Sequence, residues 1–241
     1  MSPLGLPRVH HRVLNSTNER AKALAGAGAP HGTVVTAEEQ TAGRGRQGRP
    51  WVAPRGSALL ASLVLRGLEE RHRAVLPLAA AVAVCEAAEA SADVRCSIKW
   101  PNDVWVRGRK LAGILIEGQP QEGWSVLGVG LNVLIREFSP ALAETATSLL
   151  LESSDPESPT PERVLRALLI ALERRLDEDP AALLDAWRGR DALHGREIGW
   201  NGGDGTAAGI DDRGALLVDT SEGRMALDAG EVHLGPTHSQ P

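Results

Sequence analysis

The spacing of apolar residues along the chain predicts both helices and strands. Between 161 and 176, leucine and valine recur every three or four residues after Thr160, which is typical of an amphipathic helix with a threonine N-cap. Short runs rich in valine, isoleucine and leucine predict strands. The expected helices span 16–26, 75–90, 161–176 and 180–188, and the expected strands span 9–14, 33–37, 57–65, 94–98, 104–106, 110–117 and 124–130. Because several strands follow one another through tight turns, we expect an α+β fold whose mixed, mainly antiparallel sheet packs with helices.

The C-terminal part of the chain has a different pattern. After Asp191, four short strand-like segments are separated by turns of glycine, asparagine and aspartate. These segments are 196–199, 205–210, 215–219 and 224–227. Such a succession predicts a small β-barrel. A serine-, proline- and acid-rich stretch at 151–159 is expected to be a linker. We therefore expect a main domain over 1–190 and a C-terminal domain over 191–241.

Composition narrows the class of protein. The chain has 241 residues, of which 42% are hydrophobic, so an ordinary globular protein is expected. A net charge of −5 argues against a surface built wholly for nucleic acid. Cys85 and Cys96 lack metal-site spacing, exclude a disulfide framework and fit a reducing cytosol. The longest apolar run is too short for a membrane span and no signal peptide is evident, so we expect a cytoplasmic location and no membrane partner.

One glycine- and arginine-rich segment, 40–56, interrupts the regular pattern. From Gln40 to Arg55 it holds four arginines and no acidic residue, although the protein as a whole is acidic. Glycine lets the backbone approach a ligand closely, and guanidinium groups match phosphate or carboxylate oxygens. We therefore expect a long mobile loop that binds an anion and becomes ordered around it. The alternative is a solvated basic loop, in contact with RNA or with no ligand.

Lysine is rare, with only three lysines among 26 basic residues, and two of them lie in candidate sites. Lys99 begins Lys-Trp-Pro-Asn-Asp, which can hold a phosphate and a metal-bound water or can be a plain β-turn. Lys110 heads an apolar strand, where it can neutralise negative charge in a transition state or simply protect a sheet edge. The third lysine, Lys22, is expected to be a solvated surface residue.

Two further segments are ambiguous on their own. The sequence Ser-Thr-Asn-Glu at 16–19 is a capping box that can also face a ligand. The sequence Gly-Val-Gly at 128–130 lacks the third glycine of a dinucleotide-binding fingerprint. The chain contains no Gly-Lys dipeptide, so it has no Walker A loop, and ATP would have to bind by another route.

Taken together and in order, these motifs resemble the biotin protein ligases, also called biotin–[acetyl-CoA carboxylase] ligases. The resemblance rests on Ser16-Thr17-Asn18, Gln40-Thr41-Ala42-Gly43-Arg44-Gly45-Arg46-x-Gly48-Arg49, Lys99-Trp100-Pro101-Asn102-Asp103, Lys110-Leu111-Ala112-Gly113-Ile114-Leu115-x-Glu117 and Gly128-x-Gly130-x-Asn132. It implies a catalytic domain like that of class II aminoacyl-tRNA synthetases and biotin ligases, followed by an SH3-like β-barrel. Only 15 residues precede Ser16, so the short form without an N-terminal DNA-binding domain is expected, with no DNA partner.

The resemblance also implies a reaction and a set of roles. Biotin and ATP would give biotinyl-5′-AMP, and the biotinyl group would pass to a lysine of the biotin carboxyl carrier protein of acetyl-CoA carboxylase or a related enzyme. The implied catalytic residues are Lys110, Arg46 and Asp103. The implied biotin-binding residues are Ser16, Thr17, Asn18, Gln40, Gly43, Arg44, Gly45, Arg46, Lys110 and Gly113. The implied ATP- or adenylate-binding residues are Arg44, Arg46, Arg49, Trp51, Lys99, Asn102 and Asn132.

Some points stay open at the level of sequence. No fixed metal site is expected, and Mg²⁺ would arrive with ATP, near Asp103. A lipoate or octanoate transferase of the same superfamily is an alternative enzyme, although such enzymes lack the Gly-Arg-Gly-Arg-x-Gly-Arg loop. A nucleic-acid-binding module is the alternative outside enzymology, but the chain lacks clustered base-stacking aromatic residues. The protein can be a monomer or a homodimer.

Overall fold

The computed structural model describes residues 3–154, 159–228 and 230–235. Its helices are α1 (Thr17–Gly26), α2 (Glu70–Ala74), α3 (Leu76–Ser91), α4 (Leu149–Glu152), α5 (Pro161–Asp177) and α6 (Pro180–Arg188). The strands of its larger sheet are β1 (Arg8–His11), β2 (Val34–Ala37), β3 (Ala58–Arg66), β4 (Cys96–Lys99), β5 (Asp103–Val106), β6 (Arg109–Gln119) and β7 (Trp124–Asn132). The later strands are β8 (Glu197–Trp200), β9 (Gly203–Ile210), β10 (Leu216–Thr220), β11 (Gly223–Leu227) and β12 (Val232–Leu234).

The larger sheet has seven strands in the order β1-β2-β3-β7-β6-β5-β4. Only β1 and β2 pair in parallel, and every other neighbouring pair is antiparallel. The central strand β3 is buried along nearly its whole length, because it pairs with β2 on one side and β7 on the other. The expected α+β fold with a mainly antiparallel sheet is therefore confirmed.

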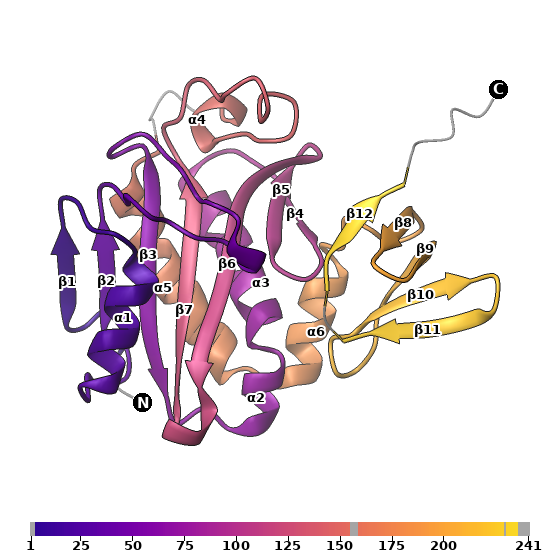
Figure 1. The fold of residues 1–241 in the computed structure, drawn as a ribbon, viewed down its shortest axis with the longest axis horizontal. Coiled ribbons are helices and arrows are strands. Elements are labelled where there is room, and N and C mark those ends of the chain that lie inside the picture. The colour runs from indigo at the N-terminus through magenta and orange to yellow at the C-terminus, as the bar shows by residue number, and fades with distance from the viewer. Residues whose placement is uncertain (1–2, 155–158, 229, 236–241) are drawn as a thin grey trace.

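Helices cover the two faces of this sheet unequally (Figure 1). On one face α3 and α5 pack against each other and against the sheet, and together they bury the main core. Thr160 caps α5 as expected, since its hydroxyl accepts a hydrogen bond from the Arg163 N–H at 3.2 Å. On the other face the short helix α1 packs mainly on β2, β3 and β7, and its Asn18 and Lys22 side chains reach Glu117 of β6. The rest of that face, over β6, is crossed by the loop between β2 and β3.

The C-terminal strands form a second, five-stranded antiparallel sheet in the order β11-β10-β9-β8-β12. Strand β12 is an addition to the expected set. Within the described residues no ladder joins β11 to β12, so the sheet is open at both edges and the expected closure into a barrel is not confirmed. Leu216 and Val218 of this sheet belong to the same buried cluster as Leu78 of α3 and Trp187 of α6, so the second sheet contributes side chains to the main core.

Two short helices, α2 and α4, were not expected. Helix α4 occupies the start of the segment expected to be a linker, because the Ser148 hydroxyl accepts a hydrogen bond from the Leu151 N–H at 3.3 Å and so caps a helical turn. The middle of that segment, 155–158, lies outside the described residues. Across the described ranges, no helix has the length and apolar character needed to cross a bilayer.

Candidate active site

A cavity of about 290 Å³ lies on the same face of the larger sheet as α1, over the part of that face that the helix leaves uncovered. Its walls are the first turn of α1, the loop 40–56, the start of β6 and the end of β7. Glycines make its floor: a Cβ on Gly128 would lie 2.1 Å from Asn18 Oδ1, and one on Gly130 would lie 2.5 Å from Trp51 Cε2. The Gly-Val-Gly sequence therefore makes room for side chains above the sheet.

One end of the cavity is lined by neutral polar groups. Thr17 N and Thr17 Oγ1 donate hydrogen bonds to Gln40 Oε1, at 2.6 and 3.0 Å. Beneath them the buried Ser62 Oγ lies 2.8 Å from Thr17 Oγ1 and 2.6 Å from Asn18 Oδ1. Ser16 caps α1 as its capping-box sequence predicts, because its hydroxyl accepts from the Glu19 N–H. Hydroxyl and amide groups held in this way form a preorganised end suited to a small polar ligand without net charge.

The loop 40–56 reverses direction, and this reversal sets the directions in which its arginine side chains point. Gln47 and Gly48 both have positive φ angles, 55° and 73°, and this reversal brings the Gly45 N–H within 2.7 Å of the Arg49 carbonyl. Arg46 can then donate to Asn102 Oδ1 at 3.0 Å and to the Gly230 carbonyl at 3.1 Å. Arg44 points the other way and forms an ion pair with Glu19. The mobility of this loop remains a prediction.

The other end of the cavity is cationic. Lys110 Nζ lies 2.7 Å from Asp103 Oδ1. This pairing follows from the hairpin of β5 and β6, which places the two residues on neighbouring strands. Asn102 is held by two hydrogen bonds to the backbone of Ile114. The side-chain Nδ2 of Asn102 donates to the Ile114 carbonyl at 2.9 Å, and the backbone carbonyl of Asn102 accepts from the Ile114 N–H at 3.0 Å. Two or more cations that converge beside a fixed amide can bind phosphate or carboxylate oxygens.

Lys99 lies next to this end, in a small hollow that it shares with Arg46, Arg49 and Asp103. Burial lowers the pKa of the Lys99 ammonium. The carboxylates of Asp103 and Glu231 work against this shift, whereas the neighbouring cations add to it. Glu231 belongs to the C-terminal segment and also forms an ion pair with Arg49 at 2.6 Å. The loop and the C-terminal segment therefore meet at the cationic end.

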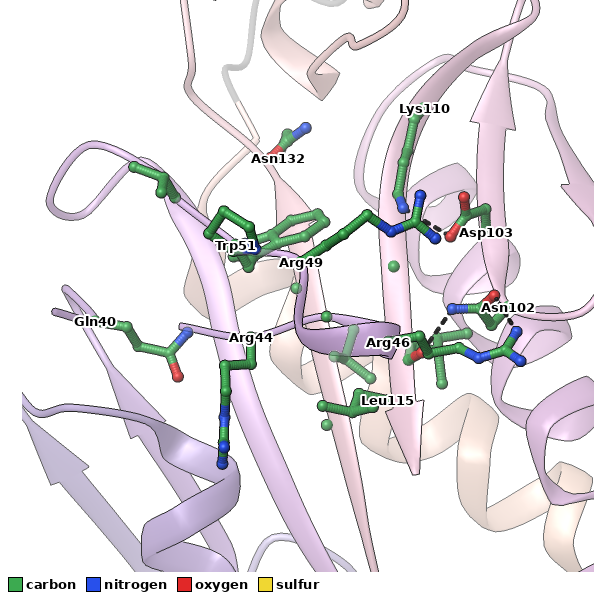
Figure 2. A pocket seen from close by; sticks show the side chains of 18 of the residues that line it. Gln40, Arg44, Arg46, Arg49, Trp51, Asn102, Asp103, Lys110, Leu115 and Asn132 are labelled. Carbon is green, nitrogen blue, oxygen red and sulfur yellow. Dashed lines mark hydrogen bonds and ion pairs between the residues drawn. The ribbon is translucent and has the colours of Figure 1, made fainter. Parts of the chain in front are cut away.

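Trp51 lies between the two ends, above the floor of glycines (Figure 2). The centroid of its ring is 5.8 Å from Lys110 Nζ, within reach of a cation–π interaction. Its indole N–H is buried and has no hydrogen-bond partner within the described residues. Figure 2 shows Gln40 and Arg44 on one side of this ring, and Arg46, Asn102, Asp103 and Lys110 on the other. The indole thus separates the cationic end from the neutral end, where the charge of Arg44 is paired with Glu19.

The structure brings nearly all of the site residues expected from sequence to this cavity. Two are displaced: Lys99 lines the adjacent hollow, and Gly43 packs inside the loop, where a Cβ would lie 2.4 Å from the Trp51 carbonyl oxygen. Lys22 was expected to be a solvated surface residue, and this was wrong. Its Nζ lies 2.7 Å from Glu19 and 2.8 Å from Glu117, and only 26% of its side chain is exposed.

Several residues that the structure places in or directly behind the site were assigned no role from the sequence. Ser62 is the single hydroxyl in the buried run of β3, and Glu117 is a carboxylate in the apolar run of β6. A polar residue inside an apolar strand was the available signal for both. Apolar lining residues from the segment after β7 were missed too, because nothing local marks them. They are Phe138, Leu142 and Ala146.

The described residues contain no group of three or more histidine, cysteine, aspartate or glutamate side chains that could hold a metal ion. Asp103 is the one carboxylate among the residues that line the cavity. This donor set fits Mg²⁺ that is carried mainly by phosphate oxygens and water, and it does not form a protein cage for the ion.

The fold and the cavity together define a binding protein whose site suits a ligand, or a pair of ligands, that is polar at one end and anionic at the other. Residues 10–133 match the model of the Biotin/lipoate A/B protein ligase family, and residues 204–235 match the Biotin protein ligase C terminal domain. The chain belongs to this family, and it is a ligase of the biotin protein ligase type. The resemblance seen in its motifs is thereby confirmed.

Proteins with similar sequences or structures match this chain over most of its length. The biotin–[acetyl-CoA-carboxylase] ligase of Mycobacterium tuberculosis is 37% identical over 233 residues, which cover 90% of this chain and 85% of that protein. The bifunctional ligase/repressor BirA of Bacillus subtilis is 35% identical over 248 residues, 96% of this chain and 75% of BirA. The biotin protein ligase from Aquifex aeolicus, solved in complex with biotin and ATP, superposes with a TM-score of 0.84 at 28% identity and covers 95% of this chain and 99% of that one.

Proposed function

We propose that this protein is an ATP-dependent ligase that activates biotin as biotinyl-5′-AMP and transfers the biotinyl group to a lysine of a biotin carboxyl carrier protein. The observation that carries the proposal is the single cavity with two unlike ends. Its neutral end suits the ureido ring of biotin, which carries N–H donors and a carbonyl acceptor. Its cationic end suits the biotin carboxylate and the ATP phosphates, which repel each other in water.

In the first step a biotin carboxylate oxygen attacks the α-phosphorus of ATP, and the bond to the β-phosphate oxygen breaks to release pyrophosphate. Lys110 belongs to the cationic end and lies beside the Trp51 ring that separates the two ends, so its ammonium is the group to bridge carboxylate and α-phosphate as negative charge builds up. Arg46 and Arg49 supply further charge from the loop. Asp103 orients Lys110 through their 2.7 Å ion pair.

In the second step the neutral amine of the carrier lysine attacks the acyl carbon of the mixed anhydride. The acyl–oxygen bond breaks, AMP leaves, and the amine loses a proton as the amide forms. Arg44, Gly45 and Arg46 would then hold the adenylate under the loop, with Trp51 against the adenine and Asn132 near the phosphates. A closed loop keeps water from the anhydride until the carrier arrives.

Four finer expectations belong to the same proposal. Mg²⁺ accompanies ATP and neutralises the phosphates, with Asp103 as the carboxylate that would face it. The carrier belongs to acetyl-CoA carboxylase or a related enzyme, as the names of the relatives suggest. We also propose a catalytic domain over 1–190 and an SH3-like C-terminal domain over 191–241. Free, buried Cys85 and Cys96 fit a reducing cytoplasm.

The test is ATP–pyrophosphate exchange with purified protein and no carrier. We expect exchange that requires biotin, because the first step is reversible and complete without the carrier. Lipoate or octanoate in place of biotin should give none. Exchange with lipoate but not with biotin would overturn the substrate assignment, and no exchange with any of the three acids would overturn the adenylation chemistry itself.

A further inference from the structure

The amide of Asn18 is held in one orientation by groups outside the cavity. Asn18 Nδ2 donates to Glu117 Oε2 at 2.8 Å and to the Leu115 carbonyl at 3.4 Å, and Asn18 Oδ1 lies 2.6 Å from Ser62 Oγ. If the amide were turned over, its oxygen would face a carboxylate, which has no hydrogen to donate. The Asn18 oxygen therefore stays on the side of Ser62 and the cavity, and the nitrogen stays on the side of Glu117.

Glu117 itself is fixed by a lysine. Its second oxygen, Oε1, accepts from Lys22 Nζ at 2.8 Å. Burial alone would raise the pKa of Glu117, but the hydrogen bonds from Lys22 and Asn18 outweigh burial and hold the pKa below its ordinary value. Glu117 is thus a carboxylate with two acceptors, each of which faces a different donor.

Gln40, on the other side of the same end, has the opposite polarity. Both bonds from Thr17 go to Gln40 Oε1, and Gln40 Nε2 donates to no group of the described residues. The neutral end of the cavity therefore offers a fixed acceptor, Asn18 Oδ1, and a fixed donor, Gln40 Nε2. A cyclic urea, which presents N–H beside C=O, has the complementary pattern.

We propose that Glu117 is a positioning residue that selects the polarity of the neutral end. It acts through the amide of Asn18, and Lys22 keeps it ionised and in place. The proposal rests on the proposed function only in taking biotin as the ligand that reads this polarity. It gives a role to the last residue of the Lys-Leu-Ala-Gly-Ile-Leu-x-Glu motif, which the reaction chemistry above does not use.

The sharpest test is Glu117→Gln, because glutamine keeps the shape and offers only one acceptor oxygen. The Lys22 ammonium takes that oxygen, since a hydrogen bond from a charged donor is the stronger one. The new NH₂ then faces Asn18 Nδ2, donor against donor, and we expect this repulsion to turn the Asn18 amide over, because the bond of Nδ2 to the Leu115 carbonyl is long, at 3.4 Å, and opposes the turn only weakly. We expect the KM for biotin in the exchange reaction to rise about tenfold or more, with kcat at saturating biotin and the KM for ATP within about twofold of wild type.

The double variant Glu117→Gln with Lys22→Met separates polarity from mere stability. Without Lys22 the glutamine oxygen is free to face Asn18 Nδ2, so the wild-type orientation returns and most of the loss in biotin KM should be recovered. A residue that only stabilised the fold would give a double variant worse than either single one. Lys22→Met alone should bind biotin normally near neutral pH. On acidification, Lys22→Met should lose affinity for biotin at a higher pH than wild type does, because removal of the lysine raises the pKa of Glu117.

Glu89→Gln is the matched control. Glu89 forms a bidentate pair with Arg190, and its side chain is 26% exposed against 29% for Glu117, but it lies away from the cavity. We expect its KM for biotin to be that of wild type. An unchanged KM for biotin in Glu117→Gln, or no recovery in the double variant, would overturn the proposal. Absence of biotin-dependent exchange in the wild type would instead overturn the proposed function.

Discussion

The two ends of the cavity are built on different principles. At the neutral end, side chains from α1, β3 and the first residue of the loop hold one another through buried and partly buried hydrogen bonds, such as those from Thr17 to Gln40 and from Ser62 to Asn18. At the cationic end, long side chains reach in from the loop and the β5–β6 hairpin, and several stay partly exposed: 59% of the Arg49 side chain and 36% of that of Lys110 are accessible.

This difference indicates what each end can do. A buried hydrogen-bonded network is rigid and punishes a ligand of the wrong polarity, because any unpaired group costs the full desolvation penalty. Long cationic side chains adapt their positions and stabilise whichever oxygens carry negative charge at each step. We expect changes at the neutral end to act on the KM for biotin, and changes at the cationic end to act on kcat and the KM for ATP.

The largest effect should come from Lys110→Ala. It removes the charge that we propose stabilises the transition state, so we expect kcat for biotin-dependent exchange to fall about 10²–10³-fold, with the KM for biotin much less affected. Lys110→Arg should recover only part of the rate, because a planar guanidinium cannot take the place of the compact ammonium beside Asp103. Steady-state exchange kinetics measure both. Near-wild-type kcat in Lys110→Ala would remove Lys110 from the mechanism and remove the division between the two ends.

Gly128→Ala should produce the complementary result at the neutral end. The added methyl would lie 2.1 Å from Asn18 Oδ1, which cannot move without breaking its bonds to Ser62 and Glu117. We expect the KM for biotin to rise about tenfold to a hundredfold while the KM for ATP changes little.

Gly26→Ala is the control for this variant, since it adds the same methyl to α1 at a place with nothing within 4 Å. Its biotin kinetics should match wild type, and helix stability should rise slightly. Equal effects of Gly128→Ala on the KM values for biotin and ATP would show that the two ends are not separable.

The two ends of the cavity also differ in how well the sequence predicts them. The arginine loop and Lys110 stand out because charge and glycine are concentrated in short segments, and the α5 helix stands out because its periodicity is local. The network around Asn18 joins residues that are 44 and 99 positions apart, and only the pairing of β3, β7 and β6 brings them together. Lys22 was misjudged for this reason, since its partner Glu117 lies on a distant strand.

The fold shows the same limit. Long buried strands such as β3 can be predicted from their apolar composition. Strand β12, by contrast, has only three residues and depends on its pairing with β8. The parallel pairing of β1 with β2 is also a non-local choice, made across the intervening helix α1. Local pattern therefore predicts elements well and their partners poorly.

A smaller effect is expected where the loop meets the C-terminal segment. In the proposed mode of binding, ATP phosphates compete with Glu231 for Arg49, so Glu231→Gln should lower the KM for ATP about two- to fivefold, the range of a partly exposed ion pair. The gain should shrink between about 0.05 and 0.5 M salt, where screening weakens exposed charges.

Glu38→Gln is the control for this variant, because Glu38 pairs with Arg55 of the same loop outside the cavity. Its KM for ATP should not change. A rise in the KM for ATP on Glu231→Gln would mean that the carboxylate holds Arg49 in its working position and does not compete with the phosphates.

The smallest effect concerns pH at the cationic end. Because burial lowers the pKa of Lys99, its positive charge is lost at a lower pH than that of an ordinary lysine as the solution becomes alkaline. The carboxylates that face it, Asp103 and Glu231, oppose this loss without reversing it. Lys99→Arg keeps the charge throughout and can still stack on Trp105, whose ring centroid is 5.5 Å from Lys99 Nζ. The KM for ATP of Lys99→Arg should therefore stay within about twofold of wild type at neutral pH. As the pH is raised, this KM should begin to increase at a higher pH than it does in wild type, and a pH series of exchange assays would measure the difference. Identical alkaline profiles for the two proteins would show that the cationic end binds phosphate without Lys99, and that the adaptable part of the cavity is confined to Lys110 and the arginines.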